Sequence, residues 1–363
     1  MPSLFRQSSP LFASLALLCL LALIAPAALR AAGEPEIKRV FSSMRAKVEI
    51  VIPLESGSAT DRDQLFSLAE AAVVKADSLL SPFGERSDIR RLNEAKAGEK
   101  VKVDSLTILV IDMAISWNEK TLGLFDPTIG PIKKLYRFDG GILDAWPEPA
   151  AIQNALANVG LENLTIDRKT GELSFAKDGC YLDLGGIAKG FAADLAAEVL
   201  LKEGVRNAIV NVGGEMRVLG IDPQKTPPGP WTIGVTDPLN RESQYEIEAQ
   251  NQALATSGSY RSFFEYEGKR YSHILDPRDG RPVEENVVGV TVGHPNSATA
   301  ADVLATVFYL LGVQGAEDYL RQHGRANFPD GLDVALFSKE GPDSLSVVTF
   351  KLDREGTLAV ERP

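Results

Sequence analysis

Two periodicities organise the first third of the chain. The run Lys-Val-Glu-Ile-Val-Ile at residues 47–52 begins with polar and apolar side chains in alternation and is rich in β-branched residues, a pattern typical of a strand. A helix is predicted over residues 61–80, because the apolar positions recur at spacings of three and four and share one face: Leu65, Leu68, Ala72, Ala76 and Leu79. The turn-forming residues 81–84 end this helix.

The rest of the chain interleaves both element types. A second helix is predicted from Ser105, as its N-cap, to Gly123. Residues 137–152 show no regular period and are predicted to form an excursion of the chain over the surface. The remaining expectations are strands at 164–166, 172–175, 208–212, 334–337 and 346–350, a strand-rich stretch over 231–292, a strand, Gly-Gly turn and helix over 181–204, and a helix over 297–312. Because strands and helices do not alternate regularly, the pattern favours an α+β fold.

The N-terminus has the sequence pattern of a secretory signal peptide. Arg6 precedes an apolar stretch over residues 11–25, and small residues follow it at 25–27 and 31–32. We therefore predict a signal peptide over residues 1–32, one domain over 33–363, and export to the periplasm. An uncleaved anchor is the alternative, but the apolar stretch is shorter than the roughly 20 residues of a span. Lipid attachment at Cys19 is disfavoured, because leucines flank it on both sides.

Composition and charge exclude several classes of protein. The 363 residues are 44% hydrophobic and 24% charged, which is ordinary for a globular domain. With 38 Lys and Arg against 49 Asp and Glu, the net charge is −11, so nucleic-acid binding is not expected. Beyond the predicted leader, Cys180 is the single cysteine, and no internal disulfide can form. We expect it to be a buried hydrophobe rather than a nucleophile.

Two segments have the composition of a ligand site. Residues 183–190, Asp-Leu-Gly-Gly-Ile-Ala-Lys-Gly, place a carboxylate, two glycines and a lysine at a helix start. Such a turn can cradle a diphosphate, although it also suits a tight structural turn. Asp302 and Thr306 lie four residues apart on one predicted helix face and offer hard oxygen ligands for Mg²⁺. A polar surface face is the alternative.

Histidine and serine patterns exclude other chemistries. Of three histidines, His273 alone lies in a site-like setting, where a strand enters a turn, and a zinc site would need a cluster of such ligands. No Gly-x-Ser-x-Gly nucleophile elbow occurs. Ser257 remains a candidate nucleophile, but a hydroxyl beside glycine is more typical of a turn or a phosphate contact.

Taken in order, six blocks resemble the ApbE family of FAD:protein FMN transferases. They span roughly residues 44–312 and read Phe-Asp-Pro-Thr at 125–128, Asp-Leu-Gly-Gly-Ile-Ala-Lys-Gly at 183–190, Asn-Val-Gly-Gly at 211–214, Ala-Thr-Ser-Gly at 255–258, Ser-His-Ile-Leu-Asp-Pro at 272–277 and Ala-Asp-Val-Leu-Ala-Thr at 301–306. The resemblance implies a T-fold-like core with a smaller second lobe and a flavin site between them. It also implies Mg²⁺-dependent transfer of FMN from FAD to a threonine or serine hydroxyl of an acceptor protein of a redox complex, with release of AMP.

The resemblance also assigns residues. The implied metal ligands are Asp302 and Thr306, joined by main-chain oxygen at Gly186 and Ala305, and His273 is the candidate base that activates the acceptor hydroxyl. The implied FAD contacts are Met44, Phe83, Leu124, Phe125, Asp126, Asp183, Lys189 and Leu275.

Two positions depart from the family pattern. Phe83 stands where tyrosine is usual, so a ring can stack but no hydroxyl can bond, and Gly186 can offer a metal only its carbonyl. Three alternatives use the same residues or compartment: an FAD pyrophosphatase with water as nucleophile, a flavin carrier without turnover, and a periplasmic solute-binding protein.

Overall fold

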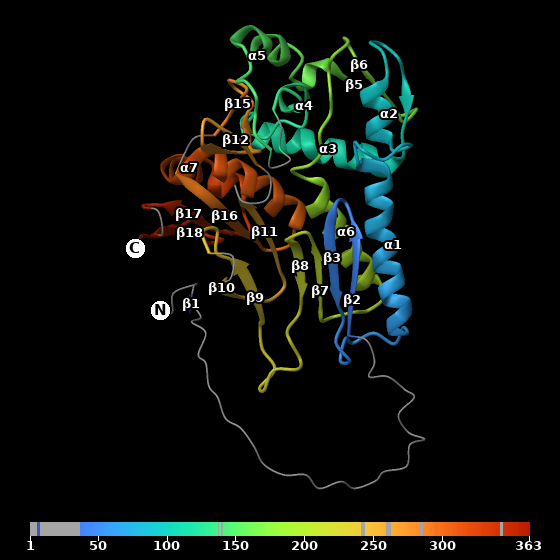
Figure 1. The fold of residues 1–363 in the computed structure, drawn as a ribbon. Coiled ribbons are helices and arrows are strands. Elements are labelled where there is room, and N and C mark those ends of the chain that lie inside the picture. Colours follow the sequence, from blue (N-terminus) through green and yellow to red (C-terminus); the bar gives the residue numbers. More distant parts are fainter. Residues whose placement is uncertain are drawn as a thin grey trace, which may run out of the picture.

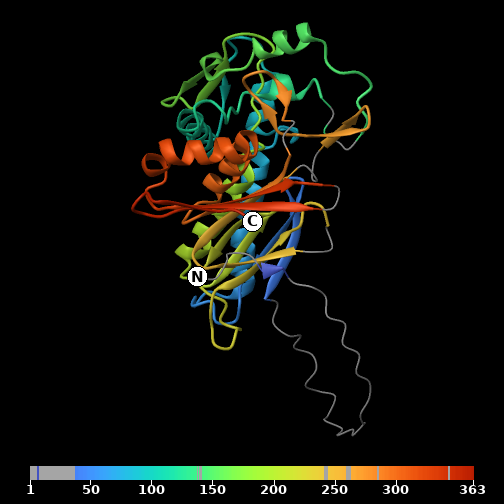
Figure 2. The same ribbon diagram turned by 90° about the vertical axis from the view of Figure 1, so that its left-hand side faces the viewer.

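The fold consists of a layered sheet domain with a second lobe above it (Figure 1). The computed structural model describes residues 6–7, 37–136, 138, 141–240, 244–258, 263–283, 286–341 and 344–363. A quarter turn shows the large sheet nearly edge-on, with helices on one side and the second lobe over its upper end (Figure 2). The predicted leader lies outside the described residues, apart from β1 (Arg6–Gln7).

The large sheet has nine strands, and its described pairings are all antiparallel. In spatial order they are β19 (Leu358–Glu361), β18 (Leu345–Leu352), β17 (Leu332–Lys339), β16 (Val287–His294), β11 (Gln252–Gly258), β8 (Glu215–Leu219), β7 (Ala208–Val212), β3 (Ala46–Val51) and β2 (Lys38–Ser43). This confirms the α+β class.

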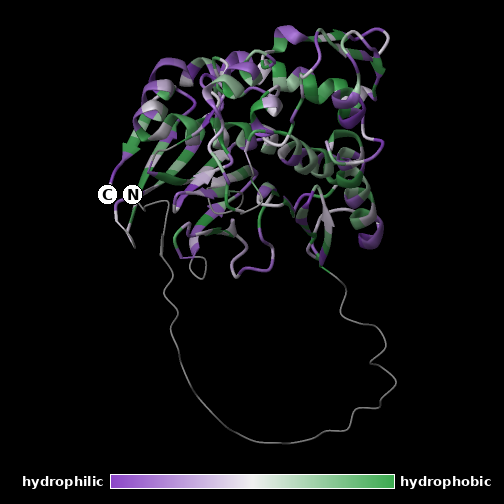
Figure 3. Ribbon diagram, turned by 45° about the horizontal axis from the view of Figure 1, so that its top comes forward, coloured by the Kyte–Doolittle hydropathy of each residue, from purple (hydrophilic) through white to green (hydrophobic). Residues whose placement is uncertain are grey.

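Strand alternation divides the apolar residues between the two faces of this sheet. In β11, Ala253 and Ala255 belong to the main core beneath the helices, whereas Leu254 packs in a separate cluster with Trp231. The helical layer consists of α1 (Arg62–Leu80), α6 (Ala188–Lys202) and α7 (Ala298–Asn327). A small sheet of β1, β10 (Gln244–Ala249) and β9 (Trp231–Thr236) covers the opposite face. Hydrophobic residues accordingly concentrate in the interior of the layers (Figure 3).

The second lobe is built from short elements. They are α2 (Asp88–Glu94), α3 (Ser105–Lys120), α4 (Gly130–Lys133), α5 (Pro149–Leu156), a 3₁₀ turn (Leu161–Asn163), β4 (Val101–Lys102), β5 (Leu164–Asp167), β6 (Glu172–Phe175), β12 (Phe263–Tyr266), β13 (Lys269–Ser272), β14 (Leu275–Asp276) and β15 (Arg281–Pro282). Part of it has its own aromatic core, in which Phe264 stacks on Tyr136 and Tyr271 at centroid distances of 5.5 and 5.1 Å.

One stretch predicted as a surface excursion is partly packed against the second lobe. Within residues 137–152, Ile142 forms a bridge with Glu265, and Leu143 and Trp146 pack in the aromatic core of the second lobe. Much of the described stretch is irregular and exposed, as expected, but Leu143 is buried, because its cluster includes residues of β12 and β13 more than 100 positions away. Helix α2 and strand β19 were also not predicted.

Several local expectations need smaller corrections. Residues 181–184 are not assigned to a strand, although one was predicted there. The Asn93 side chain holds this segment instead: it accepts from the Leu182 N–H at 2.7 Å and donates to the Leu182 carbonyl at 2.9 Å. Asp104, not Ser105, caps α3. The helix predicted over residues 297–312 is interrupted at Gly312 (φ 63°) as expected, but a helix continues beyond this residue to Asn327. Cys180 is buried as expected, 6% exposed.

Helix α7 is the core helix of the fold. Among the described residues, it is the one helix long and apolar enough to cross a membrane, yet 72% of its apolar stretch is buried inside the protein. Its residues contact β16, β11 and α6, so its apolar faces are covered by the protein itself.

Candidate active site

A cavity of about 360 Å³ lies between the sheet domain and the second lobe. Its walls come from the β2–β3 turn, the loop after α3, the start of α6, strand β11, the segment before β14, and α7. Eleven of the thirteen predicted site residues line it: Met44, Leu124, Phe125, Asp126, Asp183, Gly186, Lys189, His273, Leu275, Asp302 and Thr306. Segments distant in sequence therefore converge on one ligand-sized space.

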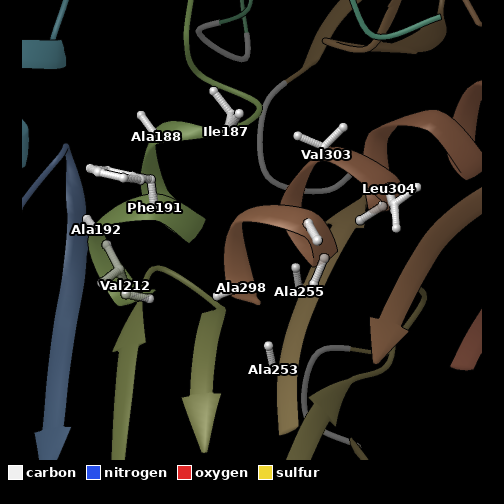
Figure 4. Packing of buried hydrophobic residues seen from close by; sticks show 14 of the residues in the cluster. Ile187, Ala188, Phe191, Ala192, Val212, Ala253, Ala255, Ala298, Val303 and Leu304 are labelled. Atoms are coloured by element: carbon white, nitrogen blue, oxygen red, sulfur yellow. The ribbon is translucent and has the colours of Figure 1, made fainter. Parts of the chain in front are cut away.

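The N-termini of α6 and α7 meet beneath this cavity and cap one another. The backbone N–H of Gly190, in α6, donates to Asp302 Oδ2 of α7 at 3.0 Å, which gives α6 the cap that Ile187 cannot supply. In return, Asp194 of α6 accepts hydrogen bonds from the N–H groups of Ala298 and Thr299 at 2.8 and 2.9 Å. Figure 4 shows the apolar packing around both helix starts.

This close approach requires glycine at position 190. A Cβ there would lie 2.2 Å from the carbonyl oxygen of Ala298, inside any permitted contact. The two helix starts are therefore held at a spacing that places Asp302 and Thr306 opposite the Gly185-Gly186 turn.

Three residues that can offer oxygen ligands, Gly186, Asp302 and Thr306, line the cavity at this junction. Asp302 is 4% exposed, and a Cβ at Gly186 would lie 3.6 Å from Thr306 Oγ1, so the turn backbone and the hydroxyl border the same space. A carboxylate, a hydroxyl and a carbonyl are hard ligands that suit Mg²⁺. Among the described residues there is no group of three His, Cys, Asp or Glu side chains placed to hold a metal, so a cation here would depend on backbone and hydroxyl oxygen beside one carboxylate.

The loop after α3 forms the wall opposite the turn. Asn118 donates to the carbonyl of Phe125 at 2.8 Å, and Thr121 Oγ1 accepts from the Phe125 N–H at 3.1 Å, so side chains of the last turn of α3 and of its C-cap residue hold the loop. Asp126 Oδ1 accepts bonds from the N–H and hydroxyl of Thr128 at 2.8 and 2.6 Å. Burial raises the pKa of Asp126, and these bonds offset only part of the rise.

The pKa of Asp183, unlike that of Asp126, is lowered by its surroundings. Burial raises its pKa, but the ammonium of Lys133 at 2.6 Å and the Gly185 N–H outweigh this, and the pKa lies below its usual value. His273 lowers the pKa of Asp183 slightly further, and both residues line the same cavity.

Charge on the cavity wall is nearly balanced. Three cations line it, Arg45, Lys133 and Lys189, against four carboxylates, Asp126, Asp183, Glu215 and Asp302. These side chains together carry one net negative charge, which would repel a dianionic diphosphate unless a divalent cation bound with it. The donor set and the charge therefore agree with a bound Mg²⁺.

The β2–β3 turn brings an unusual backbone to the cavity. Met44 and Arg45 both have left-handed φ angles, 53° and 55°, which cost non-glycine residues about 1 kcal/mol each. Asp77 of α1 holds the turn by accepting from the Met44 N–H at 2.7 Å and from the Ser43 hydroxyl at 2.9 Å. Such strain is characteristic of ligand sites.

Two predicted residues do not line the cavity. Phe83 is 61% exposed, and the guanidinium of Arg45 lies 4.4 Å above its ring, so Phe83 stands behind a residue of the wall. Ala305 has its side chain in the main core. Ser257 lines the cavity, but it lies within β11 rather than in a turn.

Sequence reasoning did not assign three charged residues of the wall: Arg45, Lys133 and Glu215. Each is adjacent to a segment that was noticed. Glu215 directly follows the block at 211–214, and Arg45 follows the implied FAD contact Met44. Lys133 follows the Gly-Pro pair at 130–131, and only the fold brings it to Asp183.

The fold and the cavity define a flavin-transferase type of domain, and the chain belongs to the ApbE family, whose sequence pattern matches residues 44–328. A curated FAD:protein FMN transferase of Salmonella typhimurium is 34% identical over 271 residues, which cover 73% of this chain and 74% of that protein. One from Vibrio cholerae is 34% identical over 262 residues, covering 71% and 77%.

Solved structures of similar proteins support the same conclusion. The flavin transferase ApbE from Vibrio cholerae aligns with a TM-score of 0.70 at 29% identity, covering 86% of this chain and 96% of that one. The flavinyl transferase ApbE of Pseudomonas stutzeri aligns with a TM-score of 0.72 at 27% identity, covering 86% and 93%.

Proposed function

We propose that this protein transfers FMN from FAD to a threonine or serine hydroxyl of an acceptor protein and releases AMP, with Mg²⁺ as cofactor. The observation that carries the proposal is the convergence of eleven family-matching residues on one cavity between the lobes. The names of the similar proteins supply the activity.

The transfer is a substitution at the FMN phosphorus of FAD. The acceptor oxygen forms a bond to this phosphorus, the bond to the bridging oxygen breaks, and AMP leaves with that oxygen. His273, on the cavity wall, is the proposed base that takes the hydroxyl proton. Lys189 and the amides of the α6 start would hold the diphosphate, since a helix N-terminus favours anions.

Asp302 and Thr306 would hold Mg²⁺ together with the carbonyl of Gly186 and, as a further proposed donor, that of Ala305. Bound there, Mg²⁺ supplies charge neutralisation to the diphosphate and to the leaving phosphate. The excess of one carboxylate on the cavity wall supports this requirement. Leu124, Phe125, Asp126 and Leu275 would contact the nucleotide from the second lobe, and Met44 from the β2–β3 turn. Phe83 would reach the flavin only if Arg45, which lies over its ring, moved aside.

The decisive experiment incubates residues 33–363 with FAD and Mg²⁺, with and without a flavin-acceptor domain. AMP release is followed together with flavin fluorescence of the denatured acceptor. Acceptor-dependent AMP with a fluorescent acceptor is expected. AMP without a labelled acceptor would support an FAD pyrophosphatase instead, and FAD binding without AMP would support a carrier. The His273→Gln variant should lose transfer, whereas His323→Gln, on the distal part of α7, is the matched control.

We further propose that residues 1–32 direct export to the periplasm and are removed. The apolar segment after Arg6 and the small residues at 31–32 support this. Fractionation and N-terminal sequencing of the expressed protein test it: a periplasmic form beginning near residue 33 is expected, and an intact cytoplasmic chain would contradict the proposal.

A further inference from the structure

A buried ion pair lies in the cavity wall, apart from the proposed metal ligands. Glu215, the first residue of β8, has a side chain only 3% exposed, and its Oε1 contacts the ammonium of Lys189. Its other oxygen, Oε2, is the one buried side-chain oxygen or nitrogen without a hydrogen-bond partner in the described part of the chain. Lys189 is therefore the polar anchor of this carboxylate.

Stability does not explain such a pair. A buried carboxylate with one satisfied oxygen loses the hydration of both, and well-packed apolar residues of similar size are often at least as stable as a buried ion pair. The pair also lies beside a cavity rather than in the closed core. A role in presenting the ammonium to a ligand is the simpler explanation.

The glycine turn before β8 lies beside this ion pair. Gly213 has a φ of 71°, and a Cβ there would lie 3.5 Å from Glu215 Oε2, 3.7 Å from Lys189 Cδ and 2.8 Å from the Cβ of Ala46. Glycine is therefore required here by Ala46 and by the positive φ, and the turn lies directly beside both members of the ion pair.

We propose that Glu215 is a positioning residue, which holds the Lys189 ammonium at the diphosphate end of the cavity. The inference rests on the proposed function, because it takes FAD as the ligand. A free lysine side chain loses rotamer freedom when it binds a phosphate, whereas one already held beside Glu215 has lost much of it before the ligand arrives. Because Glu215 Oε1 contacts the Lys189 ammonium, we expect its effect on the ligand to pass through Lys189.

The test measures binding of two fragments of FAD in the presence of Mg²⁺: ADP, which carries the diphosphate, and riboflavin, which does not. Glu215→Gln keeps the shape of the side chain and removes its charge. We expect about tenfold weaker ADP binding, equivalent to about 1.4 kcal/mol, and unchanged riboflavin binding. Glu198→Gln, an exposed site on α6, is the matched control and should change neither.

A double-mutant cycle with Lys189→Met identifies the route of the effect. If Glu215 acts through Lys189, adding Glu215→Gln to Lys189→Met weakens ADP binding no further. Additive losses, or an equal loss of riboflavin binding, would overturn the inference. Should the glutamine variant not fold, Glu215→Asp retains the charge but shortens its reach and should still weaken ADP selectively. If the wild-type protein binds FAD but these variants bind ADP normally, this inference alone is refuted. If the wild-type protein binds no FAD, the proposed function is refuted.

Discussion

Asp302 has two separable roles in the structure, and two substitutions distinguish them. Its carboxylate accepts the Gly190 N–H at 3.0 Å and, with Thr306, faces the proposed Mg²⁺ position. Asp302→Asn keeps an oxygen for the N–H but removes the charge. Asp302→Ala removes both. The asparagine variant therefore reports on the metal, and the alanine variant adds the loss of the helix cap.

The expected sizes follow from burial. Alanine leaves the Gly190 N–H without its acceptor, which costs about 1–3 kcal/mol and should lower the melting temperature by roughly 1–4 °C for a chain of this length. Asparagine should leave the melting temperature without Mg²⁺ almost unchanged, because the cap survives and a buried charge is removed. Saturating Mg²⁺ at about 100 times its dissociation constant should stabilise the wild type by about 2.7 kcal/mol. Neither variant should show that gain.

Thermal unfolding with and without Mg²⁺, together with AMP release from FAD, measures all three effects. Turnover should fall at least about 100-fold in both variants, since several kcal/mol of charge stabilisation are lost. Asp318→Asn, exposed on the same helix, is the control and should behave as wild type. A Mg²⁺-induced stabilisation of normal size in Asp302→Asn would refute the metal assignment. A normal melting temperature of Asp302→Ala without Mg²⁺ would refute the cap.

Three further predictions concern other parts of the molecule. Gly190→Ala should destabilise the protein by about 2–3 kcal/mol in urea unfolding and reduce the Mg²⁺-induced stabilisation, because the new Cβ would lie 2.2 Å from a backbone oxygen of α7; an unchanged midpoint would contradict this contact. Phe83→Ala should weaken FAD binding about three- to tenfold through loss of ring stacking, whereas Phe83→Tyr should not, and equal affinities of all three proteins in fluorescence titration would remove Phe83 from the site. Burial lowers the pKa of His294 to about 4, so the unfolded chain binds this proton first as the pH falls. The associated stability is complete above about pH 6.5 and lost towards pH 4; His294→Asn should reduce the difference in unfolding free energy between pH 7 and pH 5 by about 2 kcal/mol, and an unchanged difference would show that His294 titrates normally.

The chemistry of the site was readable from the sequence because its residues occur in short blocks. Asp302 and Thr306 are four positions apart on a helix, and Asp183 and Lys189 flank a glycine turn that begins another. Helical and strand periods also predicted α1, α6 and most strands of the sheet, since these elements bury one face and leave the other polar. Local chemistry and local period are properties of neighbouring residues, which a sequence displays directly.

Tertiary structure alone decided which of these blocks meet. Reciprocal capping by Asp194 and Asp302 joins two helices more than 100 residues apart, and the space left by Gly190 sets their separation. The buried position of Glu215, the contact between Lys133 and Asp183, and the packing of residues 142–146 likewise depend on distant partners. A linear pattern records which groups a site contains, but burial and charge pairing arise only when the chain closes around them.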